Sequence, residues 1–455
     1  MGKRNNIPLG NPEYFSILGS GIDSFEGEKS YYSTSSIQGV EIGEPEEIIT
    51  YEVRPSRANM QPIVGSVGFA KMAKTLKVLK IDEEFAEKTI LSTGFALIYG
   101  NPEKVDSSYL RYFFLSSQFN SEKDRLSTGT TQVAINQKGI EKIEVPLFDL
   151  STQQLIVSEI EKQFSRLDEG LSSLSRIREN LKSYRASLLK SAVEGRLTAE
   201  WRADHPDIEH ADVLLDHIHT ARGEKWMKEN PGKKYKEIDE IGREIDGVEI
   251  PDIWKWSSFG DLIFSGPQNG IYKPSTAYGE GISILRIDDY QNTYIKSKKE
   301  LRLLNITDSE IELYGLDEFD LVINRVNSMT HLGKSVVIPK TILPCVFESN
   351  MMRIKLSPYL SIKYIEFFLH SYIGIKQLQK NAKQAVNQAS INQQDVKDVT
   401  VPLPPLLEQH RIVEILEERF SVIDSMETLI DANIRRAENL KQAILKKAFS
   451  GELII

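Results

Sequence analysis

Cysteine, histidine and long apolar runs are all scarce in this sequence. Its 455 residues include one cysteine, Cys345, and seven histidines. A single cysteine excludes a disulfide within the chain and favours a reducing compartment. No apolar run approaches the roughly 18 residues of a membrane-spanning helix, and the N-terminal MGKRNNIPLGNPEYF lacks the apolar core of a signal peptide. The sequence therefore predicts a cytoplasmic protein with no membrane contact.

The usual catalytic motifs are also missing. There is no Gly-rich phosphate loop, no HExxH zinc motif and no serine nucleophile elbow. NPEY at 11–14 lacks the second proline of the adenine-methyltransferase motif NPPY, and no PD…D/E-x-K arrangement could hold nuclease magnesium. A metal site is conceivable among His205, His210, His217 and His219, but an exposed amphipathic helix is the simpler interpretation. We therefore expect neither catalytic residues nor a metal site.

A long internal repeat dominates the sequence instead. Residues 135–197 align without a gap on residues 391–453, with 19 identities in 63 positions. By chance roughly one position in sixteen would match. YLRYFF at 109–114 and YIEFFL at 364–369 extend the likeness. A duplication over most of the chain predicts two related halves, each with a variable domain followed by a long helix.

Apolar residues spaced by four and three predict two long helices that pack on each other. Arg178 is expected to break the first apolar stripe, which Ile177 and Tyr184 would continue in a shifted register, and Glu427 interrupts the second. Each helix should end at a glycine, at 195 or 451. Two core helices of an ordinary domain are the alternative. The expected seam consists of Ile160, Phe164, Leu167, Leu171 and Leu174 in the first helix and Leu416, Phe420, Ile423, Ile430 and Ile434 in the second.

Both halves contain basic, amide-rich stretches without acidic residues, although the net charge of the chain is −9. These stretches are residues 53–81, 321–347 and 371–394. Arginine can read guanine and amides can read adenine, so such stretches suit a DNA-contact face. A solvated basic face is the alternative for any single stretch. The candidate DNA contacts are Arg54, Arg57, Asn59, Gln61, Lys71 and Lys74 in the first half and Arg325, Asn327, Lys334, Lys376 and Lys380 in the second.

Over its whole length the chain resembles the specificity (S) subunit of type I restriction–modification systems. The resemblance rests on VPLPPLLEQHRIVEILEERFSVID at 401–424 and its copy at 145–168, on ILKKAFSGEL at 444–453 and LLKSAVEGRLTAEWR at 188–202, and on PDIWKW at 251–256 and DLVINRVNS at 320–328. It implies an α+β fold, in which two mixed α/β target-recognition domains are joined by two long antiparallel coiled-coil helices with a pseudo-twofold internal repeat. The first half lacks a counterpart of the PxxWxW opening at 251–256.

The resemblance also implies partners and a division of the chain. Each domain would read one half of a bipartite double-stranded DNA site. Two methyltransferase subunits would carry S-adenosylmethionine, restriction subunits would bring ATP and magnesium, and this chain would bind no cofactor directly. The expected parts are a first target-recognition domain (1–150), a first spacer helix (151–200), a connector (201–250), a second target-recognition domain (251–405) and a second spacer helix (406–455). A self-contained fused restriction–modification enzyme and a coiled-coil scaffold without DNA binding are the alternatives.

Overall fold

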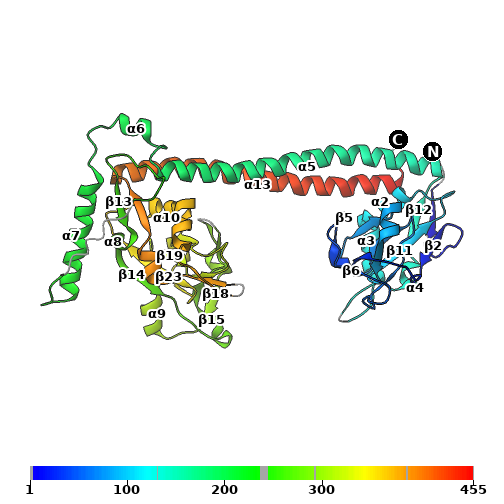
Figure 1. Cartoon of the computed structure of the whole chain (residues 1–455), viewed down its shortest axis with the longest axis horizontal. Helices are drawn as coiled ribbons and strands as arrows, with labels where there is room; N and C mark the ends of the chain where they lie inside the picture. The colour runs from blue at the N-terminus through cyan, green and yellow to red at the C-terminus, as the bar shows by residue number, and fades with distance from the viewer. Residues whose placement is uncertain (1–3, 131, 236–243, 292–293, 386–387, 454–455) are drawn as a thin grey trace. The chain divides into compact units, whose positions relative to one another are not determined.

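The computed structural model describes residues 4–130, 132–235, 244–291, 294–385 and 388–453. The chain divides into two compact units, one formed by Met1–Ile177 with Leu429–Ile455 and the other by Arg178–Thr428. Two long helices, α5 (Leu150–Val193) and α13 (Leu406–Ser450), run through both units. Each unit therefore contains one β-rich domain and one stretch of each long helix (Figure 1).

The domain of the first unit is built on two four-stranded sheets. Their strand orders are β2-β11-β8-β9, which is antiparallel throughout, and β6-β3-β10-β7, in which β10 and β3 run parallel. The first and last strands of the domain, β1 and β12, pair with each other. The elements are β1 Asn5–Pro8, β2 Phe15–Leu18, β3 Lys29–Tyr32, β4 Ile37–Gln38, β5 Glu41–Ile42, β6 Glu47–Ile49, β7 Ala58–Met60, β8 Val67–Ala70, β9 Val78–Lys80, α1 Glu83–Lys88, β10 Thr89–Ser92, β11 Phe95–Gly100, α2 Ser107–Leu115, α3 Ser117–Leu126, α4 Gln137–Ile140 and β12 Glu144–Leu147.

Aromatic residues of α2 join this domain to the long helices. Tyr109 and Phe113 are buried, and the ring of Phe449 in α13 lies edge-on to both, at centroid distances of 5.2 and 5.4 Å. Tyr112 makes a similar edge contact of 5.7 Å with Phe164 of α5. Helix α2 therefore belongs to the core of this domain.

The domain of the second unit repeats this plan. Its main sheet has the order β14-β23-β19-β21, a three-stranded sheet has the order β18-β15-β22, and its first and last strands, β13 and β26, pair with each other. Helix α10 packs against β21, where its buried Glu366 accepts a hydrogen bond of 2.8 Å from the amide of Val337. The elements are α6 Ala199–Ala203, α7 Ala211–Glu229, β13 Lys255–Ser258, α8 Phe259–Leu262, β14 Ile263–Asn269, β15 Tyr278–Leu285, β16 Tyr290–Gln291, β17 Tyr294–Ile295, β18 Arg302–Leu304, α9 Asp308–Tyr314, β19 Leu321–Asn324, β20 Val326–Asn327, β21 Ser335–Val337, β22 Cys345–Phe347, β23 Met351–Leu356, α10 Ile362–His370, α11 Tyr372–Gln379, β24 Lys383–Ala385, β25 Gln388–Ser390, α12 Gln393–Lys397 and β26 Thr400–Leu403.

Each domain holds its own long helix through the same two contacts. Tyr109 and Tyr364 each donate a hydrogen bond from the hydroxyl to a proline carbonyl in the strand that precedes α5 or α13. Gln153 and Gln409, both buried in the first turns of these helices, each accept a hydrogen bond from a backbone N–H at the start of α2 or α10, at 3.0 and 2.9 Å. The α+β fold with an internal repeat is therefore confirmed.

The two long helices run antiparallel within each unit. In the first unit Lys441 of α13 pairs with Asp168 of α5, and in the second Arg185 of α5 pairs with Asp424 of α13. The helices have 44 and 45 residues, which correspond to lengths of about 66–68 Å. The expected seam residues Ile160, Leu416, Phe420, Ile423 and Ile430 are buried, and Phe164, Leu167, Leu171, Leu174 and Ile434 are partly buried.

The expected shift of the apolar stripe at Arg178 is wrong. Ile177 and Tyr184 are each 46% exposed, whereas Arg178 and Arg185 continue the seam at the same spacing. An arginine is tolerated at this position because its aliphatic stem packs while its head finds polar partners. The guanidinium of Arg185 lies 4.4 Å from the ring centroid of Phe420 and forms its ion pair with Asp424.

The sequence predicts an exposed helix in the connector, but the helix found there, α7, is partly buried. Leu214 and Ile218 of α7 are buried in the core of the second unit. Lys225 at its end donates a hydrogen bond of 2.8 Å to the carbonyl of Phe264 and lies over that ring at 4.3 Å. The connector is thus partly packed on the second domain. Residues 236–243, in the turn-rich part of the connector, lie outside the described residues.

Glu408 ties three segments of the second unit together. It is fully buried, and its carboxylate accepts hydrogen bonds from the Thr198 hydroxyl (2.6 Å), the Arg202 guanidinium (2.6 Å) and the Trp254 indole (2.8 Å). The first two donors follow α5, and the third precedes β13. A buried carboxylate with this many partners stabilises the fold only while every partner is in place.

Replacing Glu408 with alanine should therefore destabilise the second unit by about 3 kcal/mol, because the guanidinium and the indole lose their buried acceptor. All four tryptophans, at 201, 226, 254 and 256, lie in the second unit, so urea unfolding followed by tryptophan fluorescence reports on it. The matched control is Glu414→Ala, which removes an exposed partner of Arg411 and should cost less than about 0.5 kcal/mol. Equal effects of the two substitutions would contradict this assignment.

Candidate nucleic-acid interface

Three segments of the first unit meet beyond the end of β8. The amide N–H of Lys71 donates to the carbonyl of Gly94, in the turn between β10 and β11, at 2.9 Å. The carbonyl of Lys71 accepts from the amide of Ile135 at 3.0 Å, and Ala134 forms bridges with Met72 and Thr128. The loop at 71–77, the turn at 93–94 and residues 128–130 and 132–135 therefore form one edge, which we call the first loop edge. Residue 131 lies outside the described part of the chain.

The second unit forms an equivalent edge beyond the end of β19. The amide of Arg325 donates to the carbonyl of Asn350, between β22 and β23, at 2.8 Å, and its carbonyl accepts from the amide of Ile391 at 2.9 Å. Strand β20 then pairs with the β24–β25 hairpin. We call this set, residues 325–334, 349–350, 383–385 and 388–390, the second loop edge. Residues 386–387 of the hairpin lie outside the described part of the chain.

Lys71 and Arg325 hold the same place in the two domains. Each directly follows the third strand in the order of its four-stranded sheet, β8 or β19. Each also makes the same pair of backbone hydrogen bonds. The shift of 256 residues would instead have paired Lys71 with Asn327. The ungapped shift missed this equivalence, because Lys71 lies 64 residues before Ile135, whereas Arg325 lies 66 residues before Ile391.

The first loop edge gathers part of the predicted contact set. Lys71 is partly buried, and this burial lowers the pKa of its ammonium group. Lys74 is exposed, and the carbonyl of exposed Arg57 accepts from the amide of Thr93, which brings Arg57 to the same turn. Arg54 instead stacks on Tyr51, 4.1 Å from the ring centroid. The other two candidates, Asn59 and Gln61, are partly buried in or beside β7.

The second loop edge gathers the predicted contacts of the second half more completely. The guanidinium of Arg325 donates to the carbonyl of Ser349 at 3.2 Å, and Asn327 lies in β20. Lys334 returns at the far end of the same loop, and its pKa is lowered by burial. Lys376 and Lys380 are exposed on or next to α11, the helix that packs under this loop. The role of these residues in DNA binding stays a prediction.

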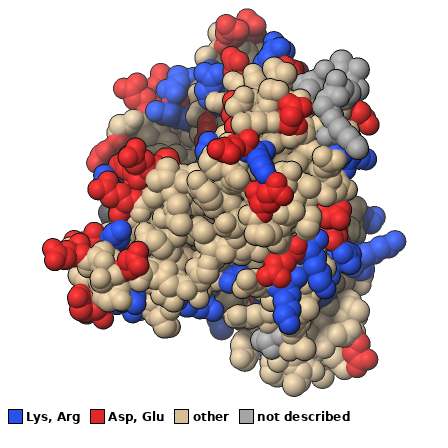
Figure 2. Space-filling view, turned by 90° about the vertical axis from the view of Figure 1, so that its right-hand side faces the viewer, with Lys and Arg blue, Asp and Glu red and all other residues tan. Residues whose placement is uncertain are grey.

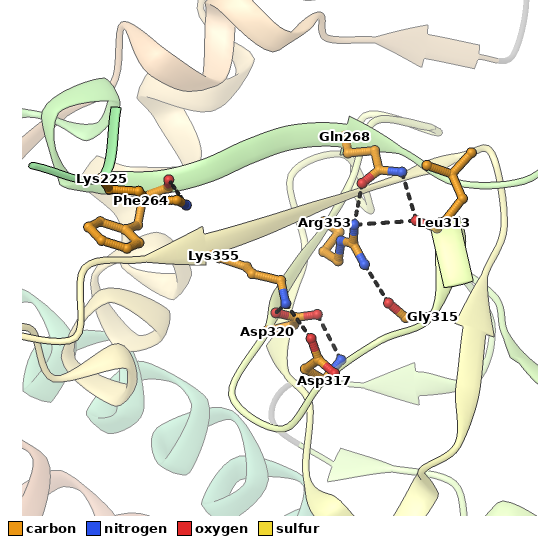
Figure 3. A network of polar contacts seen from close by, with 9 residues as sticks. All are labelled: Lys225, Phe264, Gln268, Leu313, Gly315, Asp317, Asp320, Arg353 and Lys355. Atoms are coloured by element: carbon orange, nitrogen blue, oxygen red, sulfur yellow. Dashed lines mark hydrogen bonds and ion pairs between the residues drawn. The ribbon is translucent and has the colours of Figure 1, made fainter. Parts of the chain in front are cut away.

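Other basic residues of the second unit are occupied by internal contacts. Arg353 of β23 donates hydrogen bonds to the side-chain oxygen of Gln268 and to the carbonyl of Gly315, the C-cap residue of α9 (Figure 3). Lys355 forms ion pairs with Asp317 and Asp320. These side chains hold β14, β23 and α9 together, so we assign them to the fold and not to the interface.

Charge is segregated on the surface of the molecule. On the face drawn in Figure 2, Lys and Arg side chains gather at the lower right, and Asp and Glu side chains are spread over the left, the top and the centre. Such separation allows a locally basic face on a chain with a net charge of −9.

Among the described residues, no three His, Cys, Asp or Glu side chains come together as a metal site. His205 stacks on Trp201, whereas His217 lies beside Tyr359. Burial raises the pKa of the Cys345 thiol to about 12, so this thiol is protonated at neutral pH. No helix in the described ranges is long and apolar enough to cross a membrane.

Comparisons with known proteins point in one direction. A family model described as "Type I restriction modification DNA specificity domain" matches residues 20–175 and again residues 254–433. The type I restriction enzyme EcoKI specificity subunit of Escherichia coli (strain K12) is 25% identical over 355 residues, which cover 77% of this chain and 67% of that protein. The StySPI specificity subunit of Salmonella potsdam shows the same identity and coverage.

A solved structure agrees with the fold. A chain from the work described as "Structural basis underlying complex assembly and conformational transition of the type I R-M system" aligns over 99% of this chain and 98% of its own length. The TM-score is 0.65 and the sequence identity is 20%, which shows a shared fold.

Proposed function

The chain belongs to the type I restriction–modification DNA specificity family, and we propose that each of its two domains reads one half of a two-part double-stranded DNA site. The observation that carries this proposal is the pair of loop edges. Each one places a basic residue, Lys71 or Arg325, at the same point of the same framework, with further cations nearby. Two similar readers on one chain suit a site with two separate half-sites.

The two kinds of polar side chain would have different tasks. Cations such as Lys74 and Lys376 would contact phosphates, which positions the protein without reading the sequence. Arg325 and Asn327 would read base edges in the major groove, where arginine pairs with guanine and asparagine with adenine. The net charge of −9 means that other subunits would supply much of the phosphate neutralisation.

We assign the chemistry of the complex to partner subunits. Two methyltransferase subunits would bind S-adenosylmethionine and transfer the methyl group, and restriction subunits would bring ATP and magnesium. The long helices carry exposed apolar side chains that suit helical partners: Tyr184 (46%), Val422 (50%) and Met426 (47%) in the second unit, and Ile177 (46%), Leu429 (63%) and Leu440 (47%) in the first. Because its substrate would be cellular or invading DNA, the complex is expected in the cytoplasm.

The purified chain alone should neither methylate nor cleave any DNA. Addition of the cognate methyltransferase subunit and S-adenosylmethionine should produce adenine methylation at a two-part site, which single-molecule sequencing of the product DNA would locate. The control is the methyltransferase subunit without this chain, which should leave the site unmodified. Methyl transfer by the pure chain, or methylation at a single uninterrupted sequence, would contradict the proposal.

A further inference from the structure

The basic loop of the first unit rests on a buried lysine. Lys123 of α3 is 1% exposed, and its ammonium group donates to the carbonyls of Met72 (3.2 Å) and Thr75 (2.5 Å). Between these two residues, Lys74 has a φ of +58°, a conformation that is uncommon for a residue with a side chain. Its amide donates to the carboxylate of Asp124 at 2.9 Å. Lys123 and Asp124, two consecutive residues of α3, thus hold this loop through three hydrogen bonds.

The corresponding loop of the second unit rests on an amide. Gln379 at the end of α11 donates from its side-chain nitrogen to the carbonyls of Met329 (2.8 Å) and Leu332 (2.9 Å). Gly333 has a φ of +83°, and a Cβ added there would lie 3.1 Å from Leu378, the neighbour of Gln379. The loop is therefore held against α11 at both ends of the 329–332 turn.

The two halves reach this arrangement with different chemistry. α3 and α11 follow the equivalent helices α2 and α10, and in both halves one side chain bridges two loop carbonyls three residues apart. One bridge is an ammonium group and the other an amide, although Lys123 and Gln379 lie 256 residues apart, which is the shift of the internal repeat. In both halves, a helix side chain donates hydrogen bonds to the inward-facing carbonyls of a loop. These bonds fix the loop, so that its outward-facing side chains are held in a defined place.

The way in which these two loops are held matters for DNA recognition, because the loops carry the candidate contact residues. Lys71 and Lys74 flank or occupy the first closed turn, and Arg325 and Lys334 flank the second. A loop that must be ordered on binding loses affinity and selectivity, and a loop held in advance does not. Base discrimination also requires the reading group to stay within a fraction of an ångström of its hydrogen-bond position.

We propose that Lys123 and Gln379 are positioning residues that hold the two reading loops, so that each residue controls base discrimination in one half-site and not in the other. The inference rests on the proposed function, because it assigns these residues to the same two loop edges. The sequence does not indicate either role, since Lys123 lies in the mixed-charge stretch SEKDRL and Gln379 is one of many amides.

The test uses the full chain in complex with its methyltransferase subunit. The rate of methylation is measured on the cognate site and on sites with one changed base pair in either half. Lys123→Met keeps the length of the side chain and removes its donors, and Gln379→Glu keeps the shape and replaces the donor with an acceptor. Lys123→Met should lower the ratio of cognate to changed-site rates at least tenfold for the half-site of the first domain and leave the other ratio within twofold. Gln379→Glu should do the reverse.

Two further variants separate positioning from folding. Arg125→Met removes an exposed cation of α3 that pairs with Glu122, and it should change neither ratio. Asp124→Ala releases the amide of Lys74 from an exposed site, so it tests the first loop even if Lys123→Met does not fold. Equal loss of discrimination in both half-sites, or unchanged discrimination in folded variants, would overturn the proposal. Absence of any two-part methylation by the unmodified complex would instead overturn the proposed function, and this inference with it.

Discussion

Replacing the second domain with that of a relative is expected to change one half of the methylated DNA site completely and to leave the other half as it was. The segment to exchange runs from Pro251 to Leu403, because β13 and β26 pair with each other and both lie inside it. The two ends of the graft then lie side by side, and the first loop edge is untouched. Methylome sequencing of cells that carry the hybrid would show the new half-site directly.

The structure adds one condition to this experiment. Trp254 donates to buried Glu408 outside the graft, so the incoming domain must keep a tryptophan at this position. A hybrid without that tryptophan is the informative control, since it should lose stability and not only change specificity. If a folded hybrid changed both half-sites together, the two domains would not read independently.

Lengthening both long helices by four residues is expected to widen the unread gap between the half-sites by one or two base pairs. Four residues add about 6 Å, and base pairs rise by about 3.4 Å. Lys441 pairs with Asp168, so insertions after Leu174 and after Ile434 face each other within the first unit. Four residues turn the apolar seam by only about 40°, so the helices should still pack.

An insertion of two residues at the same points is the matched control. It turns the seam by about 200°, which moves the apolar stripe to solvent and should abolish assembly of an active complex. Methylome sequencing again provides the measurement, and circular dichroism shows whether each variant is folded. An active four-residue variant with the original gap would falsify the idea that the helices measure the site.

Local pattern was enough to establish the long helices and the duplication. Ile160, Leu416 and Phe420 repeat at the spacing of a packed helical face, and that spacing follows from helix geometry alone. The terminating glycines followed from the same reasoning, and Gly195 and Gly451 do have φ values of +70° and +87°. Family motifs along the chain then identified the two-domain plan, which the matched family model confirms.

Contacts between distant segments were beyond the reach of these patterns. Arg185 continues the seam because Phe420 and Asp424, more than two hundred residues away, accept its guanidinium. Helix α7 packs on the second domain through Leu214 and Ile218, although its composition is that of a surface helix. In each case the packing depends on a partner segment that sequence spacing does not specify.

For the candidate interface, too, some features follow from the sequence and others only from the tertiary structure. Composition alone identified the acid-free basic stretches, because the excess of cations that a DNA-contact face needs is visible in the sequence whatever the fold. Only the tertiary structure decided which of them meet: it joined Lys71 and Arg57 at one turn, set Arg54 apart and made Lys71 the counterpart of Arg325. The physical reason is that strand pairing and loop length, and not distance along the chain, determine which loops share an edge.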